Sequence, residues 1–97
     1  MNKIEVYKDA IALYGPRNQM DVAIEEMSEL IKEIVKYKRG EGHLDNIIEE
    51  IADVTIMIDQ LLIIFDIDYI GDVLDVVDAK VERLQKRLNE VYEKDRI

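Results

Sequence analysis

The chain of 97 residues contains no cysteine, only one proline and only four glycines. Without cysteine it can form neither a disulfide framework nor a thiolate metal site. Because proline and glycine interrupt helices, their scarcity leaves long stretches free of breakers. Long apolar runs are missing too: the most apolar run, residues 54–65, is interrupted by Asp59 and Gln60 and is shorter than the ~20 residues that span a bilayer. These absences predict a helical chain without a membrane span.

Positive charge is also scarce, since 13 Lys and Arg residues stand against 22 Asp and Glu, a formal net charge of −9. This excess disfavours a nucleic-acid backbone or an anionic membrane as a partner. A small phosphorylated substrate stays compatible if a metal ion supplies the positive charge. Hydrophobic residues make up 48% of the chain, too many for a disordered acidic tail. We expect one small domain over residues 1–97. No apolar segment follows Met1, so we expect no signal peptide and a cytoplasmic location.

Apolar residues recur at helical spacing over residues 3–13 and again after Asn18, which is a candidate helix cap. Gly15 and Pro16 separate these two predicted helices. The second helix is expected to end in a loop of residues 37–43, where cationic residues precede two glycines.

A third helix is expected from Leu44 or Asp45 to Phe65. Its second half is apolar on nearly all sides, so it must be covered on most of them, and this suggests a partner subunit. After a turn predicted for residues 66–72, a fourth helix carries apolar residues in a heptad pattern that suits helix packing: Leu74, Val77, Val81, Leu84, Leu88 and Val91. The predicted fold is all-α, a four-helix-bundle-like arrangement completed by homo-oligomerisation as a homodimer or a dimer of dimers.

Two pairs of acidic residues stand out, Glu26 with Glu29 and Glu50 with Asp53. Residues three apart on a helix point about 60° from one another and lie about one turn apart along the axis, so the two charges in each pair repel. Two antiparallel helices that each offer such a pair can place up to four carboxylates around one cavity. Clustered carboxylate oxygens are the ligands of Mg²⁺ and Mn²⁺, and the four residues are therefore candidate metal ligands.

An alternative reading is that these acids merely solvate an exposed helix face, because runs of charge on helices are common. If the four acids bind a metal ion, the neighbouring Glu25 and Glu49 are candidates to lie just behind the ligands. A carboxylate not committed to the metal can then accept a proton from an attacking water. No E-x-x-H motif accompanies the acids, so a di-iron site of the ferritin type has little support.

The segments "EEMSEL" and "EEIADV" together resemble the E-x-x-E … E-x-x-D signature of the MazG-like, all-α nucleoside triphosphate pyrophosphohydrolases, relatives of the dimeric dUTPases. The similarity extends over about residues 19–83 and includes the order helix, loop, helix and the apolar run after the second motif. It implies that Glu26, Glu29, Glu50 and Asp53 bind Mg²⁺. It also implies cleavage of a (deoxy)nucleoside triphosphate between the α and β phosphates, giving the monophosphate and pyrophosphate.

The segment "VDAKVERL" is similar to the V-N-x-K-x-x-R segment of the same family. The resemblance implies that Lys80 contacts phosphate, with Arg83 one turn further along the helix. The resemblance implies that Asp78 binds substrate, although the family commonly has Asn at this position. A role as a further metal ligand is the alternative. From the residues alone, Lys80 and Arg83 can equally form ion pairs with acids on the same helix.

Other polar residues carry weaker indications. Gln19 matches a position that lies near the nucleotide in the resembled family, with a solvent-facing first-turn residue as the alternative. Lys38 and Arg39 are explained by the dipole at a helix end. The single histidine, His43, lies in the predicted glycine-rich loop and is expected to be solvated.

Three functions remain open from the sequence. The leading one is Mg²⁺-dependent nucleotide pyrophosphohydrolysis, with Mn²⁺ as a possible substitute. The second is a non-enzymatic helical module that dimerises through its apolar faces, with the acids as a solvated rim. The third is a relative of the enzymes that binds nucleotide without hydrolysing it.

Overall fold

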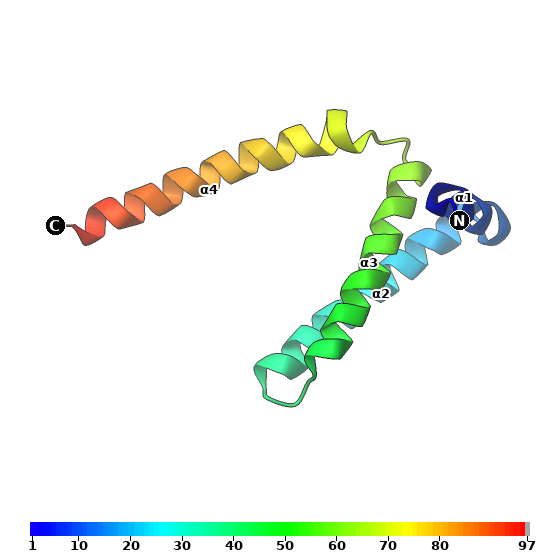
Figure 1. Cartoon of the computed structure of the whole chain (residues 1–97), viewed down its shortest axis with the longest axis horizontal. Helices are drawn as coiled ribbons and strands as arrows, with labels where there is room; N and C mark the ends of the chain where they lie inside the picture. The colour runs from blue at the N-terminus through cyan, green and yellow to red at the C-terminus, as the bar shows by residue number, and fades with distance from the viewer. Residues whose placement is uncertain (97) are drawn as a thin grey trace. The chain divides into compact units, whose positions relative to one another are not determined.

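The computed structural model describes residues 1–96, and these residues form α-helices, one π-helical segment and no strand (Figure 1). The all-α prediction is confirmed for this part of the chain. The chain divides into two compact units, the first from Met1 to Asp66 and the second beginning at Ile67. No helix among the described residues has the length and apolar character needed to cross a membrane.

Helix α1 spans Lys3–Tyr14 and matches the first predicted helix. Its N-terminus is closed by Asn2, whose side-chain oxygen accepts hydrogen bonds from the backbone N–H groups of Ile4 (3.0 Å) and Glu5 (3.4 Å). Gly15 follows with a φ of 92°, a backbone conformation that glycine adopts without steric cost.

Helix α2 spans Pro16–Lys38 and begins two residues before the cap predicted at Asn18, so that prediction is wrong. The reason is Pro16: its ring fixes φ near the helical value and its missing N–H costs nothing in the first turn. At the other end, α2 continues through Lys38, so the predicted loop of residues 37–43 is shortened to residues 39–43.

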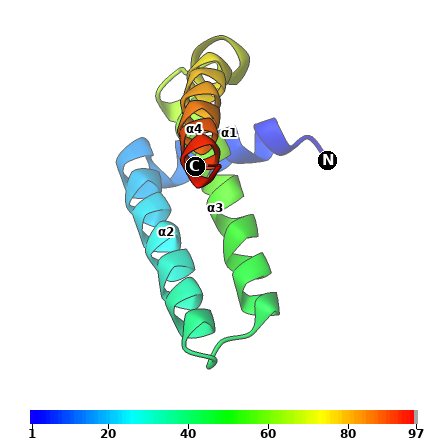
Figure 2. The same cartoon turned by 90° about the vertical axis from the view of Figure 1, so that its left-hand side faces the viewer.

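Helix α3 spans Leu44–Ile64, as predicted, and packs antiparallel against α2 (Figure 2). The loop between them turns tightly because Gly42 approaches the backbone of Tyr37, where a Cβ on residue 42 would lie 2.9 Å from the Tyr37 nitrogen. Together α2, the loop and α3 form a helical hairpin, against which α1 also packs.

The two hairpin helices meet along what we call the seam, made of residues spaced alternately three and four apart on each helix: Gln19, Ala23, Glu26, Leu30 and Glu33 on α2, and Glu50, Asp53, Met57 and Gln60 on α3. Among the described residues, only Ala23 and Met57 are buried apolar side chains. Gln19 and Gln60 are buried as well, and the Gln19 Nε2 donates a hydrogen bond to the Gln60 Oε1 at 2.7 Å. The seam is therefore mainly polar.

In the second unit, residues Tyr69–Val73 form a π-helical segment (η1) that leads directly into α4, which spans Leu74–Asp95. The turn predicted for residues 66–72 is thus corrected: residues 65–68 are non-helical, whereas residues 69–72 belong to the π-helical segment, and Asp66 has a φ of 52°. Within its own unit α4 contacts only η1. Its predicted heptad stripe is present on the helix but exposed at Val81, Leu84 and Val91.

Replacing Gln60 by alanine should lower the free energy of unfolding by about 1–3 kcal/mol, because the buried Gln19 amide loses its acceptor. Urea unfolding followed by circular dichroism measures the change. Gln85→Ala is the matched control, since Gln85 makes an exposed hydrogen bond to Asn89 on α4 and should change stability by less than about 0.5 kcal/mol. Equal effects of the two substitutions would contradict a stabilising role for the buried pair.

Candidate metal site

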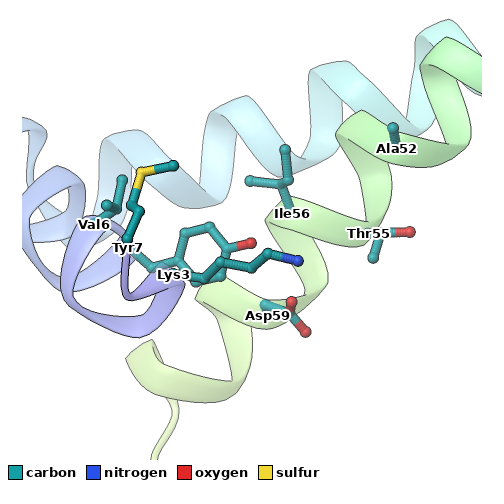
Figure 3. Close-up of a pocket in the computed structure, with 8 residues that line it drawn as sticks. Lys3, Val6, Tyr7, Ala52, Thr55, Ile56 and Asp59 are labelled. Atoms are coloured by element: carbon teal, nitrogen blue, oxygen red, sulfur yellow. The ribbon is translucent and has the colours of Figure 1, made fainter.

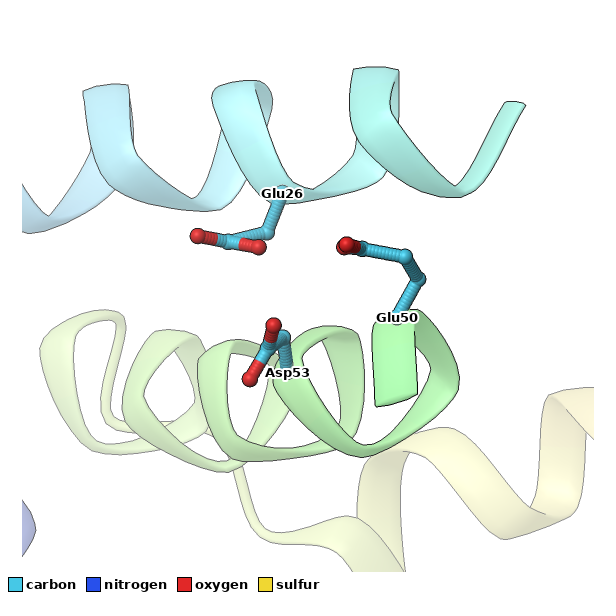
Figure 4. Close-up of side chains that lie close together, drawn as sticks. All are labelled: Glu26, Glu50 and Asp53. Atoms are coloured by element: carbon cyan, nitrogen blue, oxygen red, sulfur yellow. The ribbon is translucent and has the colours of Figure 1, made fainter. Parts of the chain in front are cut away.

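Three carboxylates converge at the seam of the α2–α3 hairpin. Glu26 comes from α2, and Glu50 and Asp53 come from α3. One oxygen from each residue lies within 4.8 Å of the others, and all three side chains are half-buried. Figure 4 shows the Glu26 carboxylate directed from α2 toward the two acids on the facing helix. Three of the four predicted ligands are therefore brought together by the fold.

The sequence spacing explains why these acids meet. Ala23 and Glu26 are three residues apart on α2, and Asp53 and Met57 are four apart on α3, so each acid lies on the same helical stripe as a buried apolar residue. Burial of Ala23 and Met57 turns these stripes toward each other. The acids are carried inward with them.

Glu29, the fourth predicted ligand, is half-buried but is not one of the three mutually close carboxylates. It precedes the seam residue Leu30 and points about 60° away from Glu26 around the helix axis. Its charge still acts on the cluster, because it contributes to the raised pKa of Glu50.

Two carboxylates of the cluster, Glu26 and Glu50, are harder to ionise than isolated glutamates. Burial, followed by the negative charges of Asp53 and Glu50, raises the pKa of Glu26 above its ordinary value of 4.5. Burial also raises the pKa of Glu50, and the charges of Asp53, Glu29, Glu33 and Glu49 add to the effect. Both shifts have the direction expected where burial and neighbouring negative charges favour the neutral form of a carboxyl group.

Two carboxylate oxygens in the described part of the chain, Oε2 of Glu33 and Oε2 of Glu50, are buried without a hydrogen-bond partner. Glu33 was not singled out from the sequence. Its other oxygen lies 3.5 Å from the Lys36 Nζ. The signal that could have found Glu33 is its position seven residues after Glu26, which places it on the same stripe of α2.

The remaining predicted site residues lie elsewhere. Gln19 is buried and bonded to Gln60 at the seam, so the solvent-facing alternative for Gln19 is wrong. His43 is exposed next to the N-terminus of α3, and Lys38 and Arg39 are exposed at the end of α2. Asp78, Lys80 and Arg83 are exposed on α4 in the second unit. The contact of Lys80 with phosphate stays a prediction.

A second feature of the first unit is an open, mostly apolar cavity of about 470 Å³ between α1 and α3 (Figure 3). Val6, Tyr7 and Ile56 line it, with Lys3 and Asp59 as charged members. None of the acids of the carboxylate cluster lines this cavity.

For the metal-free protein, we expect the free energy of unfolding to fall as the pH rises above 4.5, the ordinary pKa of a glutamate. A raised pKa means that the folded chain binds more protons than the unfolded chain between 4.5 and the shifted value. Stability is therefore lost as the pH rises through that range. Glu50→Gln should flatten this dependence and raise stability at pH 7.

Urea unfolding in EDTA at a series of pH values measures both effects. Glu41→Gln, a substitution in the exposed loop of the same hairpin, is the control and should retain the slope of the wild type. A Glu50→Gln variant whose pH dependence equals that of the control would contradict the electrostatic account.

Comparisons with known protein families, with curated proteins and with solved structures find no match to this chain. The resemblance to the MazG-like pyrophosphohydrolases therefore rests on the motif residues themselves, and membership of that family stays a prediction.

Proposed function

We propose that the protein is a Mg²⁺-dependent nucleoside triphosphate pyrophosphohydrolase. The observation that carries the proposal is the convergence of Glu26, Glu50 and Asp53 at one seam, from two helices that bear the E-x-x-E and E-x-x-D motifs in that order. The proposed active form is a homodimer or a dimer of dimers in which the hairpins complete a four-helix bundle.

The donor set fits a hard divalent cation. All three converging groups are carboxylates, the ligand type that Mg²⁺ and Mn²⁺ prefer. One oxygen of Glu50 is buried with no protein partner, and a buried polar atom of this kind calls for a partner that the protein itself does not supply. The ion would be held by Glu26, Glu50 and Asp53. Glu29, three residues after Glu26 on α2, is the fourth proposed ligand.

When bound, Mg²⁺ would neutralise phosphate charge and polarise a phosphorus atom. The reaction joins a water oxygen to a phosphorus of the α–β linkage and breaks the bridging P–O bond, so that a nucleoside monophosphate and pyrophosphate leave. A carboxylate not committed to the ion would take the proton of that water, with Glu25 and Glu49 next to the cluster as candidates. Lys80 would offset the charge of the departing group.

A non-enzymatic interaction module is the second candidate, and the exposed apolar residues favour it. Ile24, Ile31 and Ile48 are each more than half exposed in the hairpin. A chain that leaves such residues open has surface to offer a partner. In this function the carboxylates would form a solvated rim with no role in catalysis.

Wild-type protein with Mg²⁺ should release pyrophosphate from at least one member of a panel of ribo- and deoxyribonucleoside triphosphates. Glu50→Gln should reduce the rate by at least about 100-fold, because the loss of a ligand should cost at least as much as the loss of a group that only supports one. Glu41→Gln, in the exposed loop, should keep the wild-type rate. No turnover of any nucleotide, or full activity of Glu50→Gln, would overturn the enzymatic function.

Divalent-metal titration separates the two candidates without a substrate. Mg²⁺ at 100 times its dissociation constant should stabilise the wild type by about 2.7 kcal/mol, measured by thermal unfolding with and without the ion. Asp53→Asn should abolish most of this gain. A wild type indifferent to Mg²⁺ and Mn²⁺ would favour the interaction module.

A further inference from the structure

Helix α4 carries a cluster of cations on one side, which we call the cation patch: Lys80, Arg83, Lys86 and Arg87. Between Ala79 and Leu88 these four residues are accompanied by one acid, Glu82, although the whole chain has a net charge of −9. All four are exposed in the second unit. The patch is therefore a positively charged region on an acidic protein.

Helix geometry places Arg83 at the centre of the patch. Residues three and four apart on a helix are neighbours on its surface. The four residues that neighbour Arg83 in this way are Ala79, Lys80, Lys86 and Arg87. None of them is an acid, so α4 itself offers Arg83 no partner of opposite charge.

The cations of the patch form no ion pairs. Among the residues that the structure describes, the one ion pair joins Lys36 to Glu33 on α2. Glu90 lies one turn after Lys86 and Arg87 but is bonded to neither of them. Like charges at this spacing destabilise a helix, so the patch favours the binding of an anion.

The patch lies on a different side of α4 from the apolar stripe. Val81 and Leu84 are the residues of that stripe closest to Arg83 along the chain. Around the helix axis they point about 160° and about 100° away from Arg83. A partner that covers the apolar stripe therefore leaves Arg83 accessible.

We infer that the cation patch binds a compact anion with two or more phosphate groups, with Arg83 as the central contact. A guanidinium group binds phosphate through two parallel hydrogen bonds, and lysine adds a point charge. Lys80 and Arg87 lie on either side of Arg83, about 10.5 Å apart along the axis. A chain of phosphate groups can meet several of these cations at once, whereas a single carboxylate cannot.

The patch lacks the features of a nucleic-acid site. Residues 79–88 contain no aromatic side chain on which a base could stack. The net charge of −9 also repels a long phosphate backbone. A small phosphorylated anion meets the patch without approaching the acidic remainder of the protein, and the patch itself supplies the positive charge.

This site goes beyond the phosphate contact expected for Lys80, because it is centred on Arg83, includes Lys86 and Arg87 and requires no divalent ion. It does not depend on the proposed reaction. Glu50→Gln, which loses a proposed metal ligand, should bind the anion as the wild type does. Loss of the enzymatic function would therefore leave this inference standing.

Isothermal titration calorimetry of the full chain in EDTA, with inorganic pyrophosphate as the titrant, tests the site. The wild type should bind with a dissociation constant below about 1 mM. Arg83→Gln should raise this constant at least about fivefold, because the site loses a charged bidentate donor. Arg87→Gln, at one side of the patch, should raise it at least about twofold. Glutamine has a helix propensity close to that of arginine, and circular dichroism checks that the helices are retained.

Lys8→Gln is the matched control, since Lys8 is an exposed cation on α1 with Glu5 three residues before it. It should change the dissociation constant by less than about 1.5-fold. Inorganic triphosphate and ATP, each in EDTA, should bind within about twofold of one another, because only phosphate groups meet the patch. The inference is overturned if the wild type shows no saturable binding, if Lys8→Gln weakens binding as much as Arg83→Gln, or if ATP binds and inorganic triphosphate does not.

Discussion

The antiparallel packing of α2 on α3 along a polar seam is the constraint on which the first unit depends. Only Ala23 and Met57 are buried apolar residues in the described chain, and they fix which stripe of each helix faces inward. Everything else on those stripes is carried with them, including the acids Glu26, Glu50 and Asp53. The buried bond between Gln19 and Gln60 adds a directional contact at one end of the seam. Such a polar pair favours one register of the two helices, because other registers leave a buried amide unsatisfied.

This arrangement places much of the polarity inside the hairpin and much of the apolar surface outside it. In most small proteins the order is reversed, because burial of apolar surface supplies the main favourable term in folding. Here carboxylates share the seam, and burial makes Glu26 and Glu50 harder to ionise. Two additions would relieve the imbalance in different places. A divalent cation would neutralise the seam, and a partner would cover the exposed isoleucines of the hairpin.

The limits of helices α1 and α3 follow from local chemistry and were predicted to within one residue. The α1 segment is amphipathic and ends at Gly15, and α3 follows a glycine-containing loop. The start of α2 was missed, because Pro16 suits the first position of a helix as well as it breaks an existing one. The π-helical segment at Tyr69–Val73 was also missed, since no simple sequence pattern separates it from a turn. For the site, the motif spacing correctly brought Glu26, Glu50 and Asp53 together. It did not predict that Glu29 would lie outside the cluster, or that Glu33 would have a buried oxygen without a hydrogen-bond partner.

The sequence by itself determined the helical class, the antiparallel pairing of the two acid-bearing helices and the excess of negative charge, because periodicity, breakers and composition are local properties of the chain. Tertiary structure alone decided which carboxylates converge. On α2, Glu26 lies about 60° and Glu29 about 120° around the axis from the buried Ala23, so the rotation of the helix that buries Ala23 selects Glu26 over Glu29. That rotation accompanies the burial of Ala23 on α2 and of Met57 on α3, two residues far apart in the chain. The same rotation left Glu50 with an unpartnered buried oxygen and turned Ile24, Ile31 and Ile51 outward.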